Sequence, residues 1–530
     1  MPPLNLSAKP SRQVRRALAR QSPEQQNRRL SQTIVAQGAA RAAEAAQAKT
    51  ITHGHLTDAE VLAWRDDLQA RLRLIEQDPE KNLGYVEEEV AAATKDLQRV
   101  AAQRSAQAKA NATACLCRNC QRELTEQQYL RRGVDSRFGH FDIWRRYGWC
   151  PKCQEWQFPA DHALGLAKKA AASPYVQEIS ALLVTKMPPD QAVAVAERLG
   201  LDLSRCLLHR EAHRQGLKAL DARAQMVAEL ATWEDLQRLV GKSSEEPPTH
   251  PFTLVVEIDA WNIRERDDWG QTKALRKEGK KVERWHWVYM GTVFRMDHRG
   301  QTDGQRAVIT QRGFVATRHG IEALVSQLYR EALERGLCQA QQVLVIADGA
   351  VWIWNLVQDR FPHARQRLDL WHGEEHLWAV ANDLYGKGTP EAAAWVAPLL
   401  QQVRADQTPE MIQSLKELLP RLNQGLQEKL QKQIDYFADN ANRMKYKEII
   451  EARQAVEDGK ATPEQIRLAN EPLGSGAIES TCRQYQCRFK RTGQFWTTTG
   501  DEALMCLETF WRNGRWQKLY PHAKSSAALN

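Results

Sequence analysis

Two apolar runs that each end in an aspartate constrain the fold of this chain more than any other feature. The runs are LVVEID, which ends at Asp259, and VLVIAD, which ends at Asp348. A short, continuous apolar run rich in β-branched residues suits a strand that is buried on both faces of a sheet. Sites in an open α/β sheet form outside the ends of such strands. We therefore expect two neighbouring central strands that place two carboxylates side by side.

The segments around these runs predict a mixed α/β sheet. Residues 253–261, 285–294, 306–316 and 341–350 are rich in β-branched and aromatic residues and are bounded by polar residues or glycine. Residues 321–337 carry a helical pattern between the third and the fourth of these strands. Three strands, a helix and a further strand describe a mixed α/β sheet.

A chain of 530 residues is too long for one hydrophobic core, because domains usually hold about 100–200 residues. Changes in composition and periodicity divide it into six segments. They are a basic, helical N-terminal region (1–110), a thiol-rich segment (111–160), a helical segment (161–245), the strand-rich segment (246–385), a purely helical segment (386–470) and a last helical region after a Gly-Ser-Gly turn (471–525). We thus predict a multidomain α/β protein.

The charge of the chain favours a polyanionic partner. There are 74 Lys and Arg against 65 Asp and Glu, a formal net charge of +9, and neutralising phosphates releases condensed counterions. The first twenty residues are basic and contain no acid, which suits a nucleic-acid-binding arm better than an organellar transit peptide. The chain has no run of about 18 apolar residues and no secretory apolar core, so we expect no membrane span or export.

Five of the ten cysteines lie between Cys115 and Cys153. CRNC supplies Cys117 and Cys120, and CPKC supplies Cys150 and Cys153. Without a secretion signal, clustered thiols indicate a metal site rather than disulfides, and two Cys-x-x-Cys pairs can supply four thiolates to a tetrahedral Zn²⁺. We predict a zinc ribbon with a structural zinc; a redox dithiol or chance spacing is the alternative. Cys115 could replace Cys117, although the spacing favours Cys117.

Residues 175–215 resemble a helix-turn-helix. Three apolar segments at helical spacing are separated by turns, and the third carries Arg210 and Arg214. A basic second helix suits insertion into the major groove of DNA, whereas ordinary three-helix packing is the alternative. The arginines of the thiol-rich segment suit either phosphate contact or a solvated hairpin: Arg131, Arg132, Arg137, Arg145 and Arg146.

Paired carboxylates at strand ends indicate metal chemistry. Two such groups repel each other unless cations lie between them, and hard oxygen ligands favour Mg²⁺ or Mn²⁺. Two ions about 3.5–4 Å apart can hold the attacking and the leaving oxygen of a phosphodiester. The best third carboxylate is Glu479 in LGSGAIES, just inside a helix. Taken singly, Asp259 and Asp348 also suit strand-end turns and Glu479 a helix N-terminus, so the inference depends on all three together.

At this point the sequence resembles a known family. Residues 346–378 and 473–516 resemble the catalytic signatures of bacterial insertion-sequence transposases of the DDE class, in the Kra-type (ISKra) family related to the Mutator-like superfamily. The resemblance covers roughly residues 115–520 and includes the zinc ribbon and PADHALGL after it. It implies an RNase H-like mixed β-sheet catalytic core in two parts, 246–385 and 471–525, interrupted by an all-helical insertion, 386–470.

The resemblance also implies a role for each acid. Asp259 is the first catalytic aspartate, Asp348 the second and Glu479 the catalytic glutamate, and together they bind two Mg²⁺ or Mn²⁺ ions. One departure is local, because Ala260 follows Asp259 where we expect glycine. This leaves Glu257 as a substitute for Asp259, since a residue two positions earlier on a strand points to the same face.

The element LDLWH resembles the family's Asp-x-x-His motif, with Asp369 and His372. His372 is then expected to orient the scissile phosphate or to protonate the leaving group, and a structural histidine is the alternative. After Glu479, cations alternate with the aromatic residues Tyr485, Phe489 and Trp496, which suits contact with DNA near a cleaved end. The alternative is a helix with its aromatics in the core. The cations are Arg483, Arg488, Lys490 and Arg491.

The function that follows is a DNA transposase. It is expected to bind the terminal inverted repeats of its element, to cleave phosphodiester bonds with divalent ions, and to transfer the 3′-OH ends to target double-stranded DNA. Joining two ends implies a homo-oligomer, a dimer or larger, and the bacterial family implies a nucleoid-associated protein of the cytoplasm.

Three other functions are compatible with parts of the sequence. The pattern HGEEH (His372, Glu375 and His376) matches that of inverted zinc proteases. A catalytically inactive, domesticated transposase would retain the zinc ribbon and DNA binding without cleavage. An RNase H-like nuclease would cleave without strand transfer.

Overall fold

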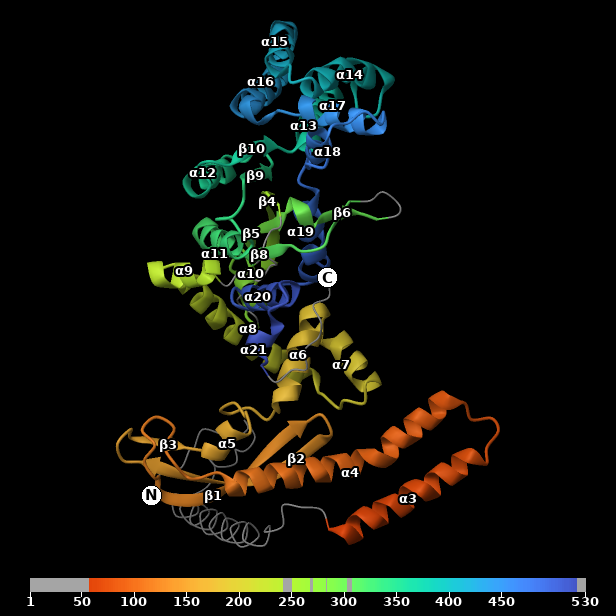
Figure 1. Cartoon of the computed structure of the whole chain (residues 1–530), viewed down its shortest axis with the longest axis vertical. Helices are drawn as coiled ribbons and strands as arrows, with labels where there is room; N and C mark the ends of the chain where they lie inside the picture. Colours follow the sequence, from red (N-terminus) through yellow and green to blue (C-terminus); the bar gives the residue numbers. More distant parts are fainter. Residues whose placement is uncertain (1–56, 242–249, 267–269, 283, 303–306, 522–530) are drawn as a thin grey trace. The chain divides into compact units, whose positions relative to one another are not determined.

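The computed structural model describes residues 57–241, 250–266, 270–282, 284–302 and 307–521 (Figure 1). The predicted basic arm at the start of the chain lies outside the described residues. Contacts divide the chain into two units. The first runs to Ile179 and includes Ala194–Ser204, and the second comprises Ser180–Val193 and the chain from Arg205 onward.

The first unit combines two long helices with a β-ribbon. Helix α3 (Asp58–Glu76) begins with a capping box in which Thr57 and Glu60 satisfy each other's backbone N–H groups. Helix α4 (Leu83–Ala112) lies against α3, and Arg104 of α4 forms an ion pair with Glu60. The N-terminal region is therefore helical where it is described, as the sequence predicts.

The ribbon is a three-stranded sheet in the order β1-β2-β3, comprising Thr125–Ser136, Gly139–Cys150 and Glu155–Gln157. Helix α4 packs along β2. Its Gln107 side chain accepts the N–H of Trp144 (2.8 Å) and donates to the Trp144 carbonyl (2.7 Å), as a neighbouring strand would. Because β3 covers only the end of β2, this contact satisfies an otherwise open edge. Helix α4 and the ribbon thus form one structure across the predicted boundary at residue 110.

Helices occupy the segment in which the sequence predicts a helix-turn-helix. After α5 (Pro159–Ala163) come α6 (Pro174–Lys186), α7 (Pro189–Arg198), α8 (Arg205–Ala228) and α9 (Trp233–Gly241). Helix α8 packs tightly on α20 (Gly500–Arg512), because a Cβ at Gly216 would lie 2.7 Å from Ala503 Cβ. One face of α8, the third predicted helix, is thus buried against α20 within the second unit.

A five-stranded mixed sheet forms the centre of the second unit. In chain order the strands are β4 (Thr253–Glu265), β5 (Arg284–Arg295), β8 (Gly313–Thr317), β9 (Gln342–Ala347) and β10 (Arg365–Leu368). In space their order is β10-β9-β4-β5-β8. Strand β5 runs antiparallel to both of its neighbours, and the other neighbouring pairs are parallel. The predicted mixed α/β sheet is confirmed.

The predicted strand over 306–316 is wrong in one respect. Its first part, β7 (Ala307–Ile309), pairs with β6 (Arg299–Gln301) in a hairpin outside the five-stranded sheet. Only β8 enters the sheet, beginning at Gly313. The polar residues 310–312 interrupt the apolar pattern at the point where the chain leaves one hairpin and joins the other sheet.

Both faces of the central strand β4 are buried, which explains its continuous apolar run. Leu254, Val256 and Ile258 face a core completed by α11 (Ile321–Glu334) and α12 (Val351–Arg360). Val255, on the opposite face, belongs to a smaller cluster that Ala477 of α19 (Gly476–Phe489) contacts. Since side chains alternate along a strand, Glu257 and Asp259 point to the α19 face.

Residues 386–470 contain only helices, as the sequence predicts, and these gather beyond β10 (Figure 1). The segment follows α13 (Leu370–Tyr385) and shares the core of the sheet rather than forming a core of its own. Tyr446, for example, is fully buried and donates to the Leu368 carbonyl of β10 (3.0 Å). Its helices are α14 (Pro390–Arg404), α15 (Thr408–Leu418), α16 (Gln424–Asn440), α17 (Lys447–Glu457) and α18 (Pro463–Ala469).

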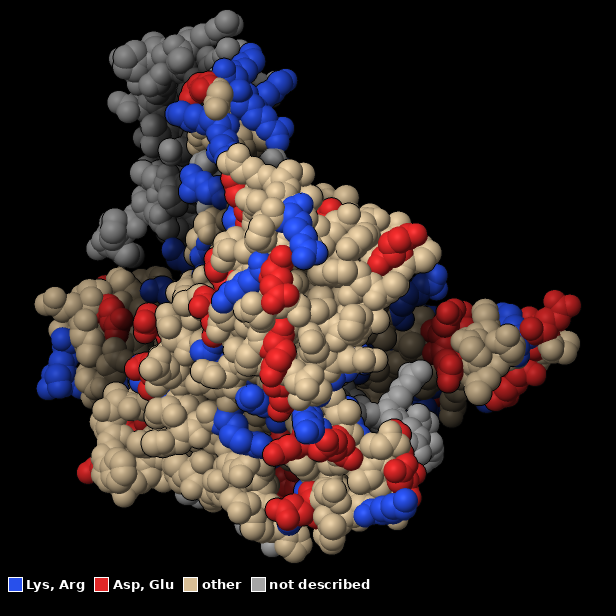
Figure 2. All heavy atoms as spheres, turned by 90° about the horizontal axis from the view of Figure 1, so that it is seen from above, with Lys and Arg blue, Asp and Glu red and all other residues tan. Residues whose placement is uncertain are grey.

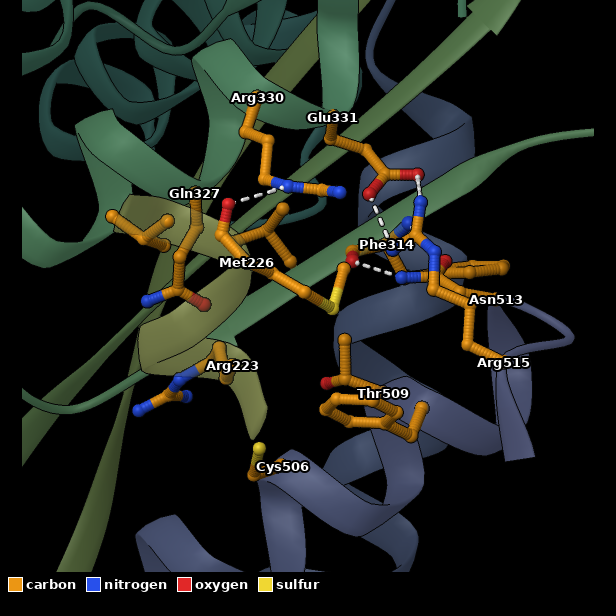
Figure 3. Close-up of a pocket in the computed structure, with 13 residues that line it drawn as sticks. Arg223, Met226, Phe314, Gln327, Arg330, Glu331, Cys506, Thr509, Asn513 and Arg515 are labelled. Atoms are coloured by element: carbon orange, nitrogen blue, oxygen red, sulfur yellow. Dashed lines mark hydrogen bonds and ion pairs between the residues drawn. The ribbon is translucent and has the colours of Figure 1, made fainter. Parts of the chain in front are cut away.

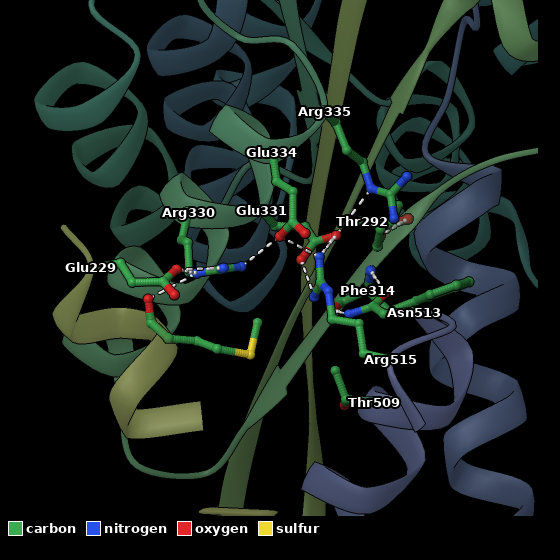
Figure 4. A network of polar contacts seen from close by, with 12 residues as sticks. Glu229, Thr292, Phe314, Arg330, Glu331, Glu334, Arg335, Thr509, Asn513 and Arg515 are labelled. Carbon is green, nitrogen blue, oxygen red and sulfur yellow. Dashed lines mark hydrogen bonds and ion pairs between the residues drawn. The ribbon is translucent and has the colours of Figure 1, made fainter. Parts of the chain in front are cut away.

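A buried ion network joins the end of the chain to α11 (Figure 4). Arg515, between α20 and α21 (Trp516–Leu519), donates to Glu331 (2.8 Å) and to Glu334 (2.6 Å) of α11. Arg330 binds Glu229 after α8 (2.7 Å). Breaking the pairs of Arg515, whose partners are both less than one-tenth exposed, would leave a buried charge without compensation, at a cost of about 3–5 kcal/mol. The network therefore fixes α11 and the C-terminal helices to each other.

The pocket in Figure 3 lies beside this network, between α8, β8, α11 and α20. Its volume is about 40 Å³, which is room for a few water molecules at most. None of the site residues predicted from the sequence lines it. Among the described helices, none is both long and apolar enough to cross a bilayer.

Candidate metal centres

The four predicted zinc ligands converge. The Sγ atoms of Cys117, Cys120, Cys150 and Cys153 all lie within 4.8 Å of one another. The separations across the two pairs are 3.7 Å between Cys117 and Cys153, and 3.5 Å between Cys120 and Cys150. Cys115 is buried nearby but does not belong to this set. The cluster can hold a structural metal such as zinc.

Both Cys-x-x-Cys pairs use the same turn. Gln121 and Gln154, the residues after each pair, have φ of 60° and 52°, and each donates its N–H to the carbonyl of the first cysteine of its pair (2.8 Å). Left-handed backbone is uncommon for residues other than glycine, so its repetition marks two matching turns. These turns place backbone N–H groups beside the sulfurs, as Cys153 N donates to Cys150 Sγ (3.4 Å).

The surroundings of the cluster favour a thiolate at Cys117. Burial raises the pKa of this thiol, but hydrogen bonds from the backbone of Cys120 and Asn119 and from the Cys150 side chain lower it to about 6. Zinc binds the thiolate form. Four thiolates leave no open coordination position, which indicates a structural rather than a catalytic metal.

Two arginines of the ribbon serve the fold. Arg132 and Arg145 both bind Asp161 of α5, and the Arg145 guanidinium lies 4.2 Å from the centre of the Phe158 ring. Both side chains are less than one-tenth exposed. These two arginines are therefore not available for the predicted phosphate contact. Arg131 is exposed, so the prediction stays open for it.

The two predicted catalytic aspartates occupy adjacent positions on neighbouring strands. In the parallel pairing of β4 with β9, Ile258 lies opposite Ala347, and the next residues are Asp259 and Asp348. Burial raises the pKa of Asp259 and the charge of Asp348 raises it further, while hydrogen bonds from Ala260 N (2.6 Å) and the Cys482 thiol lower it. The two acids thus interact as like charges in a partly buried setting.

Glu479 approaches the aspartates from α19, which packs on β4 and β5. Burial raises the pKa of Glu479, and the charges of Asp369 and Asp259 raise it too, while Arg483 lowers it. Asp259 therefore interacts with each of the other two acids, but the ligand atoms of the three do not all lie within 4.8 Å of one another. Within the described part of the chain, the four cysteines are the only set of three or more His, Cys, Asp or Glu ligand atoms that all lie within 4.8 Å of one another.

Glu257, the predicted substitute for Asp259, is engaged elsewhere. Its Oε2 accepts the N–H of Ile478 in the first turn of α19 (2.8 Å). Burial raises the pKa of Glu257 to about 8, although the Ile478 N–H lowers it. A carboxyl group that caps a helix in the interior is less suited to a metal than the more open Asp259.

Asp369 links the predicted Asp-x-x-His element to the Gly-Ser-Gly turn. As N-cap of α13 it accepts the N–H of His372 with Oδ1 (3.1 Å). Its Oδ2 accepts the N–H and the hydroxyl of Ser475, both at 2.6 Å. Asp369 and the turn are separate features in the sequence, and no local pattern indicates that they bind each other.

His372 lies in an aromatic cluster that the helical insertion completes. Its ring is 5.1 Å from that of His376, which stacks on Tyr436 of α16 at 3.7 Å. The Tyr436 hydroxyl faces the backbone after Asp348, since a Cβ at Gly349 would lie 2.9 Å from it. Burial raises the pKa of Tyr436, and the charges of Asp348 and Asp369 raise it further. No sequence signal placed Tyr436 here.

The inverted zinc-protease pattern does not form a ligand set in the described residues. His376 Nδ1 lies 2.6 Å from Gln433 Oε1, which leaves one nitrogen for other partners. Glu375 is 79% exposed, and its carboxylate is 3.9 Å from His372 Nδ1. The convergence of three ligands that a catalytic zinc needs is therefore missing among these residues.

The basic residues after Glu479 fall into two groups. Arg483, Lys490 and Arg491 are exposed. Arg488 is buried, and it donates to the carbonyls of Val184 (2.6 Å), Thr185 (3.1 Å) and Met187 (3.3 Å) at the end of α6. Arg488 is therefore engaged as a helix C-cap rather than open to phosphate. Of the residues predicted on α8, Arg210 is exposed and Arg214 pairs with the buried Glu211 (2.7 Å).

A basic hollow of about 220 Å³ lies beside the second half of α19. Lys186, Arg491 and Arg512 line it, and Glu508 binds the first of these at 2.5 Å and the last at 2.7 Å. On the face that Figure 2 draws, cations and acids are scattered among uncharged residues over much of the surface. The hollow is thus a local concentration of positive charge on the half of α19 that follows Glu479.

The comparisons with known proteins leave the family open. No protein-family model matches the chain, and no curated protein matches it. The function is therefore inferred from the residues and their geometry.

Proposed function

We propose that the chain is a DDE transposase, a metal-dependent DNA nuclease and strand transferase with Asp259, Asp348 and Glu479 as its catalytic acids. The observation that carries the proposal is the strand register, which sets the two aspartates side by side with α19 packed over them. In the five-stranded sheet only β5, the second strand in chain order, runs in the opposite direction. In the chain, the helices of residues 386–470 separate this sheet from α19. Both features are compatible with an RNase H-like core.

The chemistry of these side chains, rather than a converged set of ligand atoms, suits a pair of hard divalent cations. The candidate ligands are carboxylates, which Mg²⁺ and Mn²⁺ prefer. The charge of Asp348 raises the pKa of Asp259, and the charge of Asp259 raises the pKa of Glu479. Cations between them would relieve this repulsion. When bound, two such ions supply Lewis-acid stabilisation of the attacking and leaving oxygens.

The chain's own residues then hold and orient the substrate. Asp259 interacts electrostatically with both Asp348 and Glu479, so we propose it as the ligand that the two cations share. His372 on α13 is exposed enough to reach a phosphate, and its backbone is fixed by Asp369. The exposed cations Arg483, Lys490 and Arg491 offer contacts to the backbone of DNA.

The proposed substrate is double-stranded DNA that carries the terminal inverted repeats of the element, with a second duplex as target. The ribbon of the first unit and α8 are the proposed recognition elements, the former held by Zn²⁺. Joining two ends requires two active sites, so we propose a homodimer or larger assembly in the bacterial cytoplasm, on the nucleoid.

Incubation with duplex DNA that carries both flanks of the gene, with and without Mg²⁺, tests the proposal. Nicks mapped to the ends of the element, followed by joining to a second duplex, are expected. Cleavage without joining would indicate an RNase H-like nuclease. Tight binding without Mg²⁺-dependent cleavage would indicate a domesticated, inactive protein and would refute the enzyme.

Replacing Arg491 by Gln is expected to weaken DNA binding uniformly across sequences. The slope of log K against log salt is negative, and each phosphate contact removed makes it shallower by about 0.9. Fluorescence anisotropy from 50 to 200 mM salt measures this slope, whose magnitude should decrease by about one. The control is Lys447→Gln, an exposed cation of α17, which should leave the slope unchanged. Equal slopes in both variants would remove Arg491 from the interface.

A further inference from the structure

Two buried carboxyl groups bind the backbone that leads to Glu479. Glu257 on β4 accepts the N–H of Ile478 (2.8 Å). Asp369, directly after β10, accepts the N–H and the hydroxyl of Ser475 (both 2.6 Å). These acids come from the strands on either side of β9, so they hold the start of α19 from two directions. The free N–H groups at a helix start are natural donors to such acceptors.

The turn before α19 is fixed on its other side as well. Leu370 N of α13 donates to the Leu473 carbonyl (3.1 Å). Gly474 lies so close to α13 that a Cβ there would be 2.3 Å from the Trp371 ring and 2.9 Å from Asp369 Oδ1. By contrast, the Glu479 side chain is 51% exposed. Its position is therefore set by the start of its helix more than by packing of its own.

We infer that Glu257 and Asp369 are positioning residues that present Glu479 to Asp259, and that neither binds the catalytic metal. The inference rests on the proposed function, because it takes Glu479 as the third metal ligand. In metal sites, groups that orient the ligands affect metal affinity by about 10- to 100-fold. Here the oriented group is a whole helix turn rather than one side chain.

Glu257 and Asp369 differ in how many of their hydrogen bonds a neutral amide side chain can still accept. Glu257→Gln keeps a carbonyl oxygen that can accept from Ile478 N, whereas Glu257→Leu removes the acceptor at similar volume. Asp369 accepts with both oxygens, from His372 on one and Ser475 on the other. Asp369→Asn turns one acceptor into an NH₂ donor that faces an N–H, so one of these contacts must break.

The test uses the full chain and two readouts. Hydrogen–deuterium exchange of residues 474–480 reports on the turn, and the Mg²⁺ concentration for half-maximal cleavage of the flanking DNA reports on the metal site. Glu257→Leu and Asp369→Asn are expected to speed exchange and to raise the Mg²⁺ requirement by about 10-fold or more. Glu257→Gln and the distant control Glu451→Gln should stay close to the unaltered chain. Ser475→Ala, which removes one donor to Asp369, should give an intermediate result even if Asp369→Asn fails to fold.

Each other outcome overturns part of the inference. Faster exchange with an unchanged Mg²⁺ requirement would make the contacts merely structural. Unchanged exchange in Glu257→Leu and Ser475→Ala would show that the acids do not hold the turn. An equal loss in Glu257→Gln and Glu257→Leu would make Glu257 a metal ligand. If the unaltered chain does not cleave DNA with Mg²⁺, the proposed function and the positioning role fail together, while the exchange rates still report separately on the turn.

Discussion

Asp348→Asn is expected to reduce Mg²⁺-dependent DNA cleavage by on the order of 10³-fold, because loss of a metal ligand removes several kcal/mol of charge stabilisation. Strand transfer should fall with it, since both steps use the same acids. Binding to the DNA ends should stay nearly unchanged, because Asp348 lies at the end of β9 and carries no positive charge. Gel assays of nicking and joining, with anisotropy for binding, separate these effects.

The fold is not expected to suffer from this substitution. Asp348 raises the pKa of Asp259, so a neutral residue at 348 removes a repulsion between like charges. Without metal, the melting temperature should therefore stay the same or rise. Mg²⁺ should raise the melting temperature of the unaltered chain but not that of Asp348→Asn, since only a ligand that binds the folded state stabilises it.

The matched control is Asp359→Asn, at an exposed position of α12. It makes the same chemical change in the helix that follows Asp348, and it should leave cleavage and the Mg²⁺ effect unaltered. Full cleavage by Asp348→Asn would end the assignment of the acids. Equal losses in both variants would point to an effect of net charge instead.

The sequence located Asp348 because a strand end leaves a local signal: the apolar run stops where β9 ends. The same expectation is wrong for Asp259, because β4 continues to Glu265 and Ile263 is fully buried. Asp259 lies in mid-strand, and it is the end of β9 beside it that brings Asp348 next to it. Glu479 could be found from the turn before its helix. Cys482 also had a signal that was missed, since it lies one turn after Glu479 on the same helix face and its thiol reaches Asp259.

Residues that act through distant partners could not be placed in this way. Arg488 stands among exposed cations in the sequence, yet it caps a helix some 300 residues earlier in the chain. Glu257 interrupts an apolar run, which implies a buried partner but does not say that the partner is the start of α19. Tyr436 arrives from an insertion that docks through packing and through contacts such as that between Gln433 and His376, none of which is local in sequence. Such contacts arise from tertiary structure, which periodicity does not encode.

The double variant Cys150→Ser, Cys153→Ser is expected to lose one bound zinc ion per chain and to unfold the end of the ribbon that carries the cysteines. Structural zinc sites contribute about 10–16 kcal/mol of binding energy at neutral pH, and this energy is also folding energy. The end of the ribbon that carries the cysteines has little to replace it, because its apolar cluster adds only Leu124 and Cys115 to the ligands. The other end has a cluster of its own around Phe141 and Ile143. Metal analysis and limited proteolysis should show the loss, with cleavage sites appearing between residues 113 and 158.

The second unit should survive this loss, because its sheet and helices have a core of their own. A protected fragment that begins after residue 158 and keeps α8 with the sheet is therefore expected. The exposed control Cys338→Ser should keep both its zinc and its ribbon. Cys115→Ser decides between the two possible ligand sets, because Cys115 lies outside the cluster of converging sulfurs. It should retain one zinc ion, even if its burial makes the substitution somewhat destabilising. Unchanged zinc in the double variant, or zinc lost from Cys115→Ser alone, would show that the ligands are not the four cysteines that converge here.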